Sequence, residues 1–299
     1  VSKEGNSPFT YVIVDNQTKT RTCIHTPGFP PMIPDDLSKS SLLSALDGVR
    51  LVYFDVRLHE TALVVAQEAR RKCIPILIDA EKKRDGLDDL LNFSDYVVCT
   101  AKFPQAWTEA PSVPSALVSM LLRLPNLKFV IVTLGEHGCI MLERSTIPSC
   151  FIDGIIAKYR LLLQLHLLIG ILPPAQGVQS EEIDIDSSLE ELKQKVDTNV
   201  AIPTSIHSTV TKFVAKGVGM VTGRLFLGTA EKIPPFELVD TTGAGDAFIG
   251  AVVYAICSNM PPEKMLPFAA QVAAASCRAL GARTGLPHRT DPRLSSFLD

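Results

Sequence analysis

The chain has 299 residues and a formal net charge of −3, and its 29 lysines and arginines are scattered without a basic run. This charge pattern argues against a nucleic-acid surface and against a patch for acidic membranes. Hydrophobic residues make up 46% of the sequence, as in ordinary globular proteins. The length fits one large α/β domain or two modest ones.

The N-terminal part begins with a predicted hairpin and continues with alternating strands and helices. Residues 9–15 and 20–25 are rich in apolar and β-branched residues around a polar turn, which predicts two paired strands. Such alternation of short apolar runs with helical segments predicts βαβ units and a parallel sheet covered on both faces. The later strands are expected at 51–55, 75–80, 95–99 and 128–135, and the helices at 60–71, 86–91 and 114–124.

The later elements are fewer and less regular. Residues 138–144 follow a glycine turn and are expected to pair as an antiparallel edge strand. Residues 237–240 resemble the end of a strand. Helices are predicted at 245–257, where Phe248 and Val252 share a face, and at 265–280, where small residues permit close packing.

Residues 145–212 do not follow this alternation of strands and helices. They are expected to form an atypical insertion or a poorly ordered segment. The run 161–172 is strongly apolar but too short for a bilayer span of roughly 20 residues. The acidic stretch 181–197 is expected to form a loosely attached helix. No membrane association is therefore predicted.

The seven cysteines are widely spaced and include no C-x-x-C pair. An odd number without such pairs argues against a disulfide framework or a zinc site. Buried, reduced thiols in a cytoplasmic compartment are expected, with organelle import left open. The first residues also lack the pattern of a secretory signal peptide.

The strongest chemical signal is V-D-T-T-G-A-G-D-A-F at residues 239–248. A strand end, two turn glycines and a helix start would place free backbone N–H groups and the positive end of a helix at one point. Such a point binds phosphate or carboxylate. Asp246 adds a negative charge there. From spacing alone, it either favours the helix N-terminus or has a catalytic role.

A general base would explain a carboxylate beside an anion site. Phosphoryl transfer to an alcohol needs charge neutralisation, in-line positioning and removal of the hydroxyl proton. The sequence contains no Walker A loop. Residues 217–223, GVGMVTG, have the wrong spacing for a dinucleotide fingerprint and are interpreted as turn glycines, which argues against a dinucleotide-dependent oxidoreductase.

The segment DTTGAGDAF resembles the C-terminal signature of the ribokinase (PfkB) family of carbohydrate and nucleoside kinases. VTLGEHGCIML at 132–142 is similar to the family's nucleotide-side strand, and residues 269–285 to the segment lining its adenine pocket. Residues 53–60 and 76–103 look most like the ketohexokinase branch. The resemblance implies a three-layer α/β/α sandwich over residues 1–299, with a mostly parallel central sheet and a small β lid.

The resemblance also implies a role for each matching residue. Asp246 would be the catalytic base, with Gly243, Ala244 and Gly245 as the anion hole. Arg57 would reach the phosphates, or else be an ordinary surface arginine. ATP, Mg²⁺ and a monovalent cation such as K⁺ would be the cofactors. The residues expected along the nucleotide are Thr133, Gly135, Gly138, Thr242, Ala274 and Cys277.

Asp240 and Thr242 are the residues expected to hold the monovalent cation. The other interpretation of Asp240 is a carboxylate hydrogen-bonded to the turn that follows it. Many family members carry an N-x-x-E motif that organises magnesium-bound water, whereas this chain has Thr100-Ala101-Lys102-Phe103 at that place. This departure favours the ketohexokinase branch and leaves the metal shell open.

A second departure lies at the start of the chain. Family members begin with a strand bearing a sugar-binding aspartate and a G-G-x-x-x-N segment, and neither is present here. The chain is therefore expected to be N-terminally truncated, with the lid and the first strands of the sheet incomplete.

The resemblance favours an ATP-dependent kinase for a ketose-like sugar. The alternatives are a nucleoside kinase of the same family and a catalytically silent binding protein. A homodimer is expected by analogy, because lid strands in the family often pair between subunits.

Overall fold

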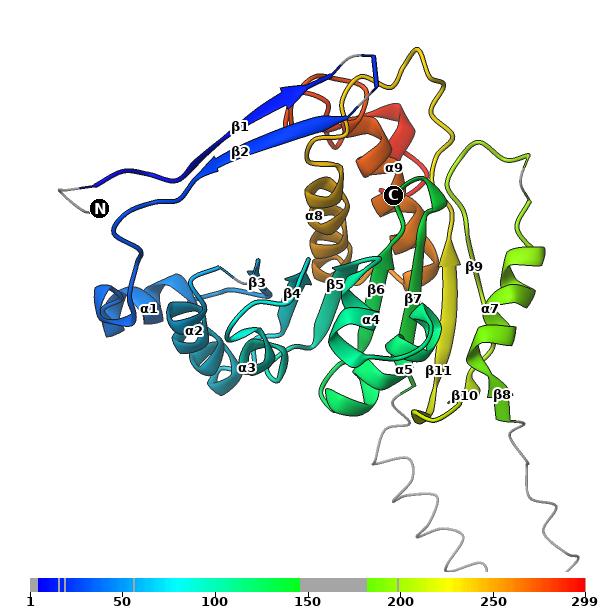
Figure 1. The fold of residues 1–299 in the computed structure, drawn as a ribbon, viewed down its shortest axis with the longest axis horizontal. Helices are drawn as coiled ribbons and strands as arrows, with labels where there is room; N and C mark the ends of the chain where they lie inside the picture. The colour runs from blue at the N-terminus through cyan, green and yellow to red at the C-terminus, as the bar shows by residue number, and fades with distance from the viewer. Residues whose placement is uncertain are drawn as a thin grey trace, which may run out of the picture.

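The computed structural model describes residues 5–15, 17–18, 20–55, 57–145, 182–197 and 199–298. Its strands form one two-stranded and one nine-stranded sheet (Figure 1). In the large sheet the order is β3-β4-β5-β6-β7-β11-β10-β8, and β9 pairs with β11. The α/β class predicted from the sequence is confirmed. The strands of the large sheet are β3 (Val52–Phe54), β4 (Ile76–Ala80), β5 (Tyr96–Thr100), β6 (Phe129–Thr133), β7 (Cys139–Arg144), β8 (Glu182–Asp184), β9 (Ser205–His207), β10 (Thr211–Ala215) and β11 (Gly219–Gly228).

Strands β3 to β6 are mutually parallel, whereas β7, β11 and β10 are joined by antiparallel pairs. Helices cover both faces of this sheet, as continuous apolar strands require. The helices are α1 (Lys39–Ala45), α2 (His59–Arg71), α3 (Leu87–Leu91), α4 (Phe103–Thr108), α5 (Val113–Arg123), α7 (Ile185–Gln194), α8 (Ala244–Cys257) and α9 (Pro262–Ser276).

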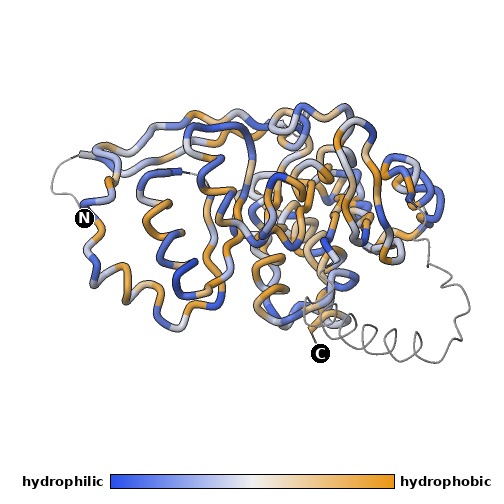
Figure 2. The backbone as a smooth tube through the Cα atoms, turned by 90° about the horizontal axis from the view of Figure 1, so that it is seen from below, coloured by the Kyte–Doolittle hydropathy of each residue, from blue (hydrophilic) through white to orange (hydrophobic). Residues whose placement is uncertain are grey.

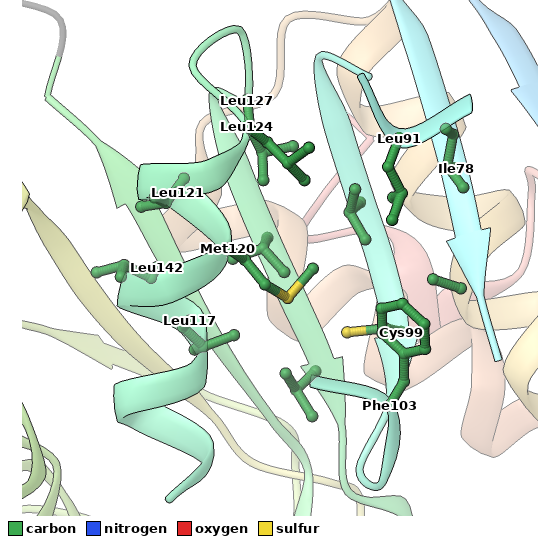
Figure 3. Packing of buried hydrophobic residues seen from close by; sticks show 14 of the residues in the cluster. Ile78, Leu91, Cys99, Phe103, Leu117, Met120, Leu121, Leu124, Leu127 and Leu142 are labelled. Carbon is green, nitrogen blue, oxygen red and sulfur yellow. The ribbon is translucent and has the colours of Figure 1, made fainter. Parts of the chain in front are cut away.

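Two hydrophobic clusters, one on each face, define the three layers. Alternate residues of a strand point to opposite faces, so Ile76 and Ile78 of β4 join one cluster and Leu77 joins the other. The first cluster includes α2 to α5 and α7, and Figure 3 shows part of it packed between α5 and the sheet. The second cluster includes α8 and α9. Figure 2 shows hydrophobic residues gathered where these layers meet.

A separate two-stranded hairpin, the part of the chain in which the resemblance implies a β lid, precedes the large sheet. Strands β1 (Phe9–Val14) and β2 (Arg21–Thr26) pair antiparallel and run above the large sheet toward α8 (Figure 1). Four large apolar side chains share one face of this hairpin and are exposed: Phe9, Tyr11, Ile13 and Ile24.

Several expectations about the sheet are wrong. β7 is antiparallel as predicted, but it lies inside the sheet between β6 and β11 rather than at an edge. Residues 219–223 are not turn glycines, because they begin β11, and only Gly217 lies in the turn before it, with φ +75°. Residues 237–240 form no strand.

The helix predictions also need correction. The helix expected at 265–280 spans Pro262–Ser276, and α1 and α4 were not predicted. The acidic helix α7 is not loosely attached, because Ile185, Leu189 and Leu192 are buried in the first cluster. Of the stretch 145–212, residues 182–212 with the exception of 198 therefore contribute to the main sheet and its cover. The rest of the predicted insertion, 146–181, lies outside the described residues.

Candidate active site

The glycine turn, residues 241–246, connects an irregular segment to helix α8. The N–H groups of Val239 and Asp240 donate to the carbonyl of Cys277 at the end of α9, at 2.9 and 3.2 Å. Gly243 then takes a left-handed conformation with φ +78°, and α8 begins at Ala244. A methyl group on Gly243 would lie 2.9 Å from Cα of Ala282, so both the conformation and the space require glycine here.

The turn leaves backbone donors free, as an anion site needs. Ala244 N–H donates to the carbonyl of Thr241 at 3.2 Å, so this member of the predicted anion hole is already engaged. The N–H groups of Gly243, Gly245 and Asp246 have no acceptor among the described residues. These three donors lie at the positive end of a 14-residue helix, which favours an anion.

Asp246 lies in the first turn of α8 with its side chain exposed. It lines a cavity of about 560 Å³ between α8, α9 and the C-terminal segment. Gly250 and Tyr254 continue the same open side of α8, and Arg283 and Arg289 also line the cavity. The carboxylate is therefore accessible to a molecule that occupies this cavity.

Asp240 is buried, and each of its carboxylate oxygens accepts one backbone hydrogen bond. Its Oδ1 accepts from Thr242 N–H at 2.8 Å, and its Oδ2 accepts from Gly281 N–H at 2.8 Å. Burial alone would raise the pKa of this carboxyl, but hydrogen bonds from Thr242 and Gly281 and the charge of Arg21 lower it overall. Asp240 thus forms the hydrogen bonds of its alternative interpretation, and each of its oxygens keeps a further lone pair for a cation. Thr242 Oγ1 is buried without a hydrogen-bond partner among the described residues.

Two residues that the sequence analysis did not single out lie close to these groups. Arg21 of β2 donates from Nη1 to Thr241 Oγ1 at 2.7 Å, which joins the hairpin to the glycine turn. Asp79 of β4 points to the same face as Leu77, the face that α8 covers. The only signal for Asp79 was a carboxylate within the apolar run PILIDA.

Asp79 has an unusual electrostatic environment. Burial raises its pKa to about 6, Tyr53 opposes the shift by donating its hydroxyl to Oδ2 at 3.3 Å, and the charge of Asp246 raises the pKa further. The pKa of Tyr53 is raised by burial and by Asp79, Asp55 and Asp246. Negative charge therefore accumulates where the carboxyl ends of β3 and β4 meet the start of α8, and such perturbed groups often mark functional sites.

Asp79→Asn is expected to raise the free energy of unfolding at pH 8 and to have little effect below about pH 4. Folding raises the pKa of Asp79 from 3.8 to about 6, so the folded chain favours the protonated carboxyl. Its contribution is most favourable at low pH and is lost as the pH rises through about 6. Urea unfolding of both proteins between pH 4 and 8, in chelator, measures the difference. A difference in unfolding free energy that does not change with pH would contradict the raised pKa of Asp79. Asp47→Asn, at an exposed position, is the matched control.

The other residues predicted to lie along the nucleotide are found in two parts of the fold. Thr133 ends β6 and donates to the carbonyl of Cys99 at 3.3 Å, and Gly135 begins a short 3-10 helix. Gly138 has φ +82°, and a methyl group there would lie 2.0 Å from the carbonyl oxygen of Gly228. These residues form the tight connection between β6 and β7, as the sequence predicted for a glycine turn.

Ala274 and Cys277 are buried near the end of α9. Only Cys277 is directly joined to the glycine-turn region, through its carbonyl. Arg57 is 56% exposed and pairs with Asp55 at 3.3 Å, which fits its interpretation as a surface arginine better than a contact with the glycine turn. Six cysteines in the described part of the chain are free thiols, and Cys150 lies outside it.

Two further features concern the described residues alone. No helix among them is long and apolar enough to cross a bilayer. They also contain no group of three or more His, Cys, Asp or Glu side chains placed to hold a metal ion.

Sequence comparisons match the part of the chain that contains the glycine turn. The sequence model of the pfkB family of carbohydrate kinases matches residues 215–289, which include the glycine turn and α9. A mouse ribokinase is 33% identical over 112 residues, and the match covers 33% of this chain and 35% of the mouse protein.

Solved structures show the same architecture. A ribokinase from Thermotoga maritima has a TM-score of 0.56 and 18% identity, with 98% of this chain and 70% of that chain covered. An adenosine kinase from Anopheles gambiae has a TM-score of 0.59 and 14% identity, with 96% and 67% covered. A Burkholderia thailandensis nucleoside kinase, solved with inosine, has a TM-score of 0.54 and 14% identity, with 98% and 70% covered.

The match with the mouse ribokinase spans about a third of either protein. The chain has the ribokinase-like α/β fold, and its segment 215–289 matches the sequence model of the pfkB family of carbohydrate kinases.

Proposed function

We propose that the protein transfers the γ-phosphoryl group of ATP to a hydroxyl of a small sugar, of the ketose type that the ketohexokinase-like segments favour. The observation that carries this proposal is the glycine turn, where three free N–H groups stand beside the exposed carboxylate of Asp246. A silent binding protein would have no need to keep both features.

Each part of the turn has a chemical role in this reaction. The free amides of Gly243, Gly245 and Asp246 would hold the phosphoryl oxygens and stabilise their charge. Asp246 would take the hydroxyl proton as the acceptor oxygen bonds to phosphorus. The bond from phosphorus to the bridging oxygen then breaks, ADP leaves, and the proton remains on Asp246.

Magnesium would accompany ATP, since a protein often binds this ion through one or two carboxylates together with the phosphates. Asp79 fits this role, because its carboxylate is partly desolvated among other carboxylates and a cation there would relieve their repulsion. Bound Mg²⁺ would neutralise charge on the phosphates. For a monovalent cation, the orphaned Thr242 Oγ1 beside Asp240 supplies an oxygen, and we propose this pair as its site.

A nucleoside is the second candidate acceptor. The solved structures with this fold include kinases for adenosine and other nucleosides as well as ribokinases. The cavity beside Asp246 is lined mainly by apolar side chains such as Phe268, Val272 and Leu286, and it has few groups to recognise sugar hydroxyls.

Two further proposals concern assembly and location. The exposed apolar face of the hairpin, with Tyr11 and Ile24 opposite each other, is suited to pairing with a second copy in a homodimer. The free thiols support a reducing compartment such as the cytoplasm.

Release of ADP, measured with a panel of sugars and nucleosides, tests the function. A clear rate is expected with one class of acceptor, sugar or nucleoside, and ADP release without an acceptor is expected to be low. Absence of any acceptor-dependent rate would contradict the kinase.

A further inference from the structure

A second cavity lies at the opposite end of the large sheet from the glycine turn. β11 pairs antiparallel with β7, and β7 pairs antiparallel with β6, so β11 starts at the same end of the sheet as the parallel strands do. In Figure 1, α5 and the turn between β10 and β11 lie at this end, away from the hairpin. That turn and the connection between α4 and α5 border a cavity of about 430 Å³. This volume is within the range of about 300–1,000 Å³ that small-molecule sites usually have.

Arg123, the last residue of α5, forms part of one wall and is held in a fixed orientation. Its Nη2 donates to the carbonyl of Thr108 at 2.8 Å, and its Nη1 donates to the carbonyl of Trp107 at 3.3 Å. The guanidinium carbon also lies 5.3 Å from the centroid of the Trp107 ring. Among the described residues these are its only hydrogen bonds, so most of the five N–H donors of the guanidinium are free. A fixed guanidinium with free donors is well suited to an anionic oxygen group.

Two more charged side chains line this cavity. Lys216 lies on the turn before β11, and Glu109 lies in the connection between α4 and α5. Both are exposed, and neither forms an ion pair or a side-chain hydrogen bond with any residue that the structure describes. With Arg123, the lining has two cations and one carboxylate. Its net charge therefore favours an anion, while Glu109 is left to accept hydrogen bonds from other parts of a bound molecule.

Ser119 of α5 distinguishes this cavity from an ordinary charged surface. It lines the cavity and is only 5% exposed. A serine inside a helix often donates to the carbonyl four residues earlier, but the hydroxyl of Ser119 forms no hydrogen bond within the described parts of the chain. The hydroxyl is not sealed in the core either, since the enclosed and unpaired side-chain oxygen of those parts is that of Thr242. Ser119 thus presents a free hydroxyl to whatever occupies the cavity.

We propose that this cavity is a second small-molecule site, which binds a metabolite with one phosphate or carboxylate group and a hydroxylated body. Arg123 and Lys216 hold the anionic group, and Ser119 donates its hydroxyl to it. Glu109 accepts a hydrogen bond from a hydroxyl of the body, and Leu122 supplies an apolar surface beside it. The inference goes beyond the proposed function and does not depend on it, because none of the described residues that line this cavity takes part in the proposed reaction.

The test uses Trp107, the one tryptophan of the chain, as a fluorescent reporter. Because Arg123 lies over its ring, an anion bound by Arg123 is expected to change the emission of Trp107. Glycerol 3-phosphate, glycerate and glycerol are the probes, since they have similar bodies and differ in the anionic group. At least one of the two anions is expected to give a saturable change, and the one with the lower dissociation constant identifies the preferred group. Saturation by glycerol, or an equal response to sodium chloride at the same ionic strength, would overturn the proposal.

Two variants connect the response to the cavity. Lys216→Gln and Ser119→Ala are each expected to raise the dissociation constant of the bound anion by roughly 2- to 10-fold, as loss of one hydrogen bond does. Both are expected to fold like the parent, because Lys216 is exposed and alanine favours a helix more than serine does. Lys264→Gln is the matched control, since Lys264 is exposed and does not line the cavity. Unchanged affinity in both variants, or an equal loss in the control, would overturn the proposal.

Amide chemical shifts measured by NMR give a second readout on the same protein and probes. The shifts are expected to change at 109–110 and 216–218, which border the cavity. A response limited to residues 241–246 would place the anion at the glycine turn and would overturn the second site while supporting the first. No response to either anion in fluorescence and in these amide shifts would overturn the second site and leave the proposed kinase reaction unaffected.

Discussion

Asp246→Asn is expected to lower kcat by about 10²- to 10⁴-fold, which is the usual contribution of a general base. The affinity for ATP is expected to change by no more than about twofold, because the amides of the glycine turn are unaltered. Asparagine is nearly isosteric with aspartate and still accepts hydrogen bonds, but it cannot take the acceptor proton. The rate is measured as acceptor-dependent ADP release.

This variant also separates the two interpretations of Asp246. A carboxylate that only complements the positive end of α8 stabilises by about 0.3–1 kcal/mol, and its removal leaves turnover unchanged. A catalytic base gives the reverse pattern, with a large loss of kcat and a small change in stability. Asp47→Asn, on an exposed loop, is the matched control for loss of one charge. Turnover equal to that of the parent would end the general-base assignment.

Local features of this site were predictable from the sequence. The order V-D-T-T-G-A-G-D implies a turn and a helix start because glycine conformation and free helix-end amides depend on adjacent residues. The central strands β4 to β6 were equally evident from buried apolar runs. Such properties depend on residues that are neighbours along the chain, so they can be predicted from a single sequence.

The groups that approach from elsewhere in the fold were not predictable in this way. Arg21 lies 220 positions from its hydrogen-bond partner Thr241, and nothing near it in the sequence indicates that contact. Asp79 reaches the charge of Asp246 only because β4 lies beneath α8 in the folded chain. Its raised pKa comes first from burial, which spacing does not reveal.

Two differences between the predicted and the observed fold concern segments whose sequence pattern agrees with the structure. Helix α7 is acidic overall, yet its apolar residues recur at 185, 189 and 192, which is the spacing of one helical face. The glycines in 219–223 looked like a turn, but Gly223 lies in β11 at a close approach. A methyl group there would meet the carbonyl oxygen of Glu143 on β7 at 2.1 Å.

Gly243→Ala is expected to destabilise the protein and to weaken ATP binding together. An alanine at φ +78° costs about 1–2 kcal/mol for its left-handed conformation. The added methyl group would also lie 2.7 Å from Cβ and 2.9 Å from Cα of Ala282, and relief of that overlap adds about 1–3 kcal/mol. Any shift of the turn misdirects the free amides, so ATP affinity is expected to fall at least about tenfold, since one lost charged hydrogen bond suffices for that.

Gly217→Ala is the matched control, because Gly217 has φ +75° in the turn before β11 and open space around the added methyl group. It shares the conformational cost and lacks the overlap, so urea unfolding is expected to show the larger loss for Gly243→Ala. Gly245→Ala has neither problem, and it should unfold like the parent. Equal unfolding free energies for Gly243→Ala and Gly217→Ala would mean that the backbone at Ala282 moves away from the added methyl group without measurable cost. Unchanged ATP affinity in Gly243→Ala would remove the glycine turn from the nucleotide site, because no phosphate held by those amides could ignore their displacement.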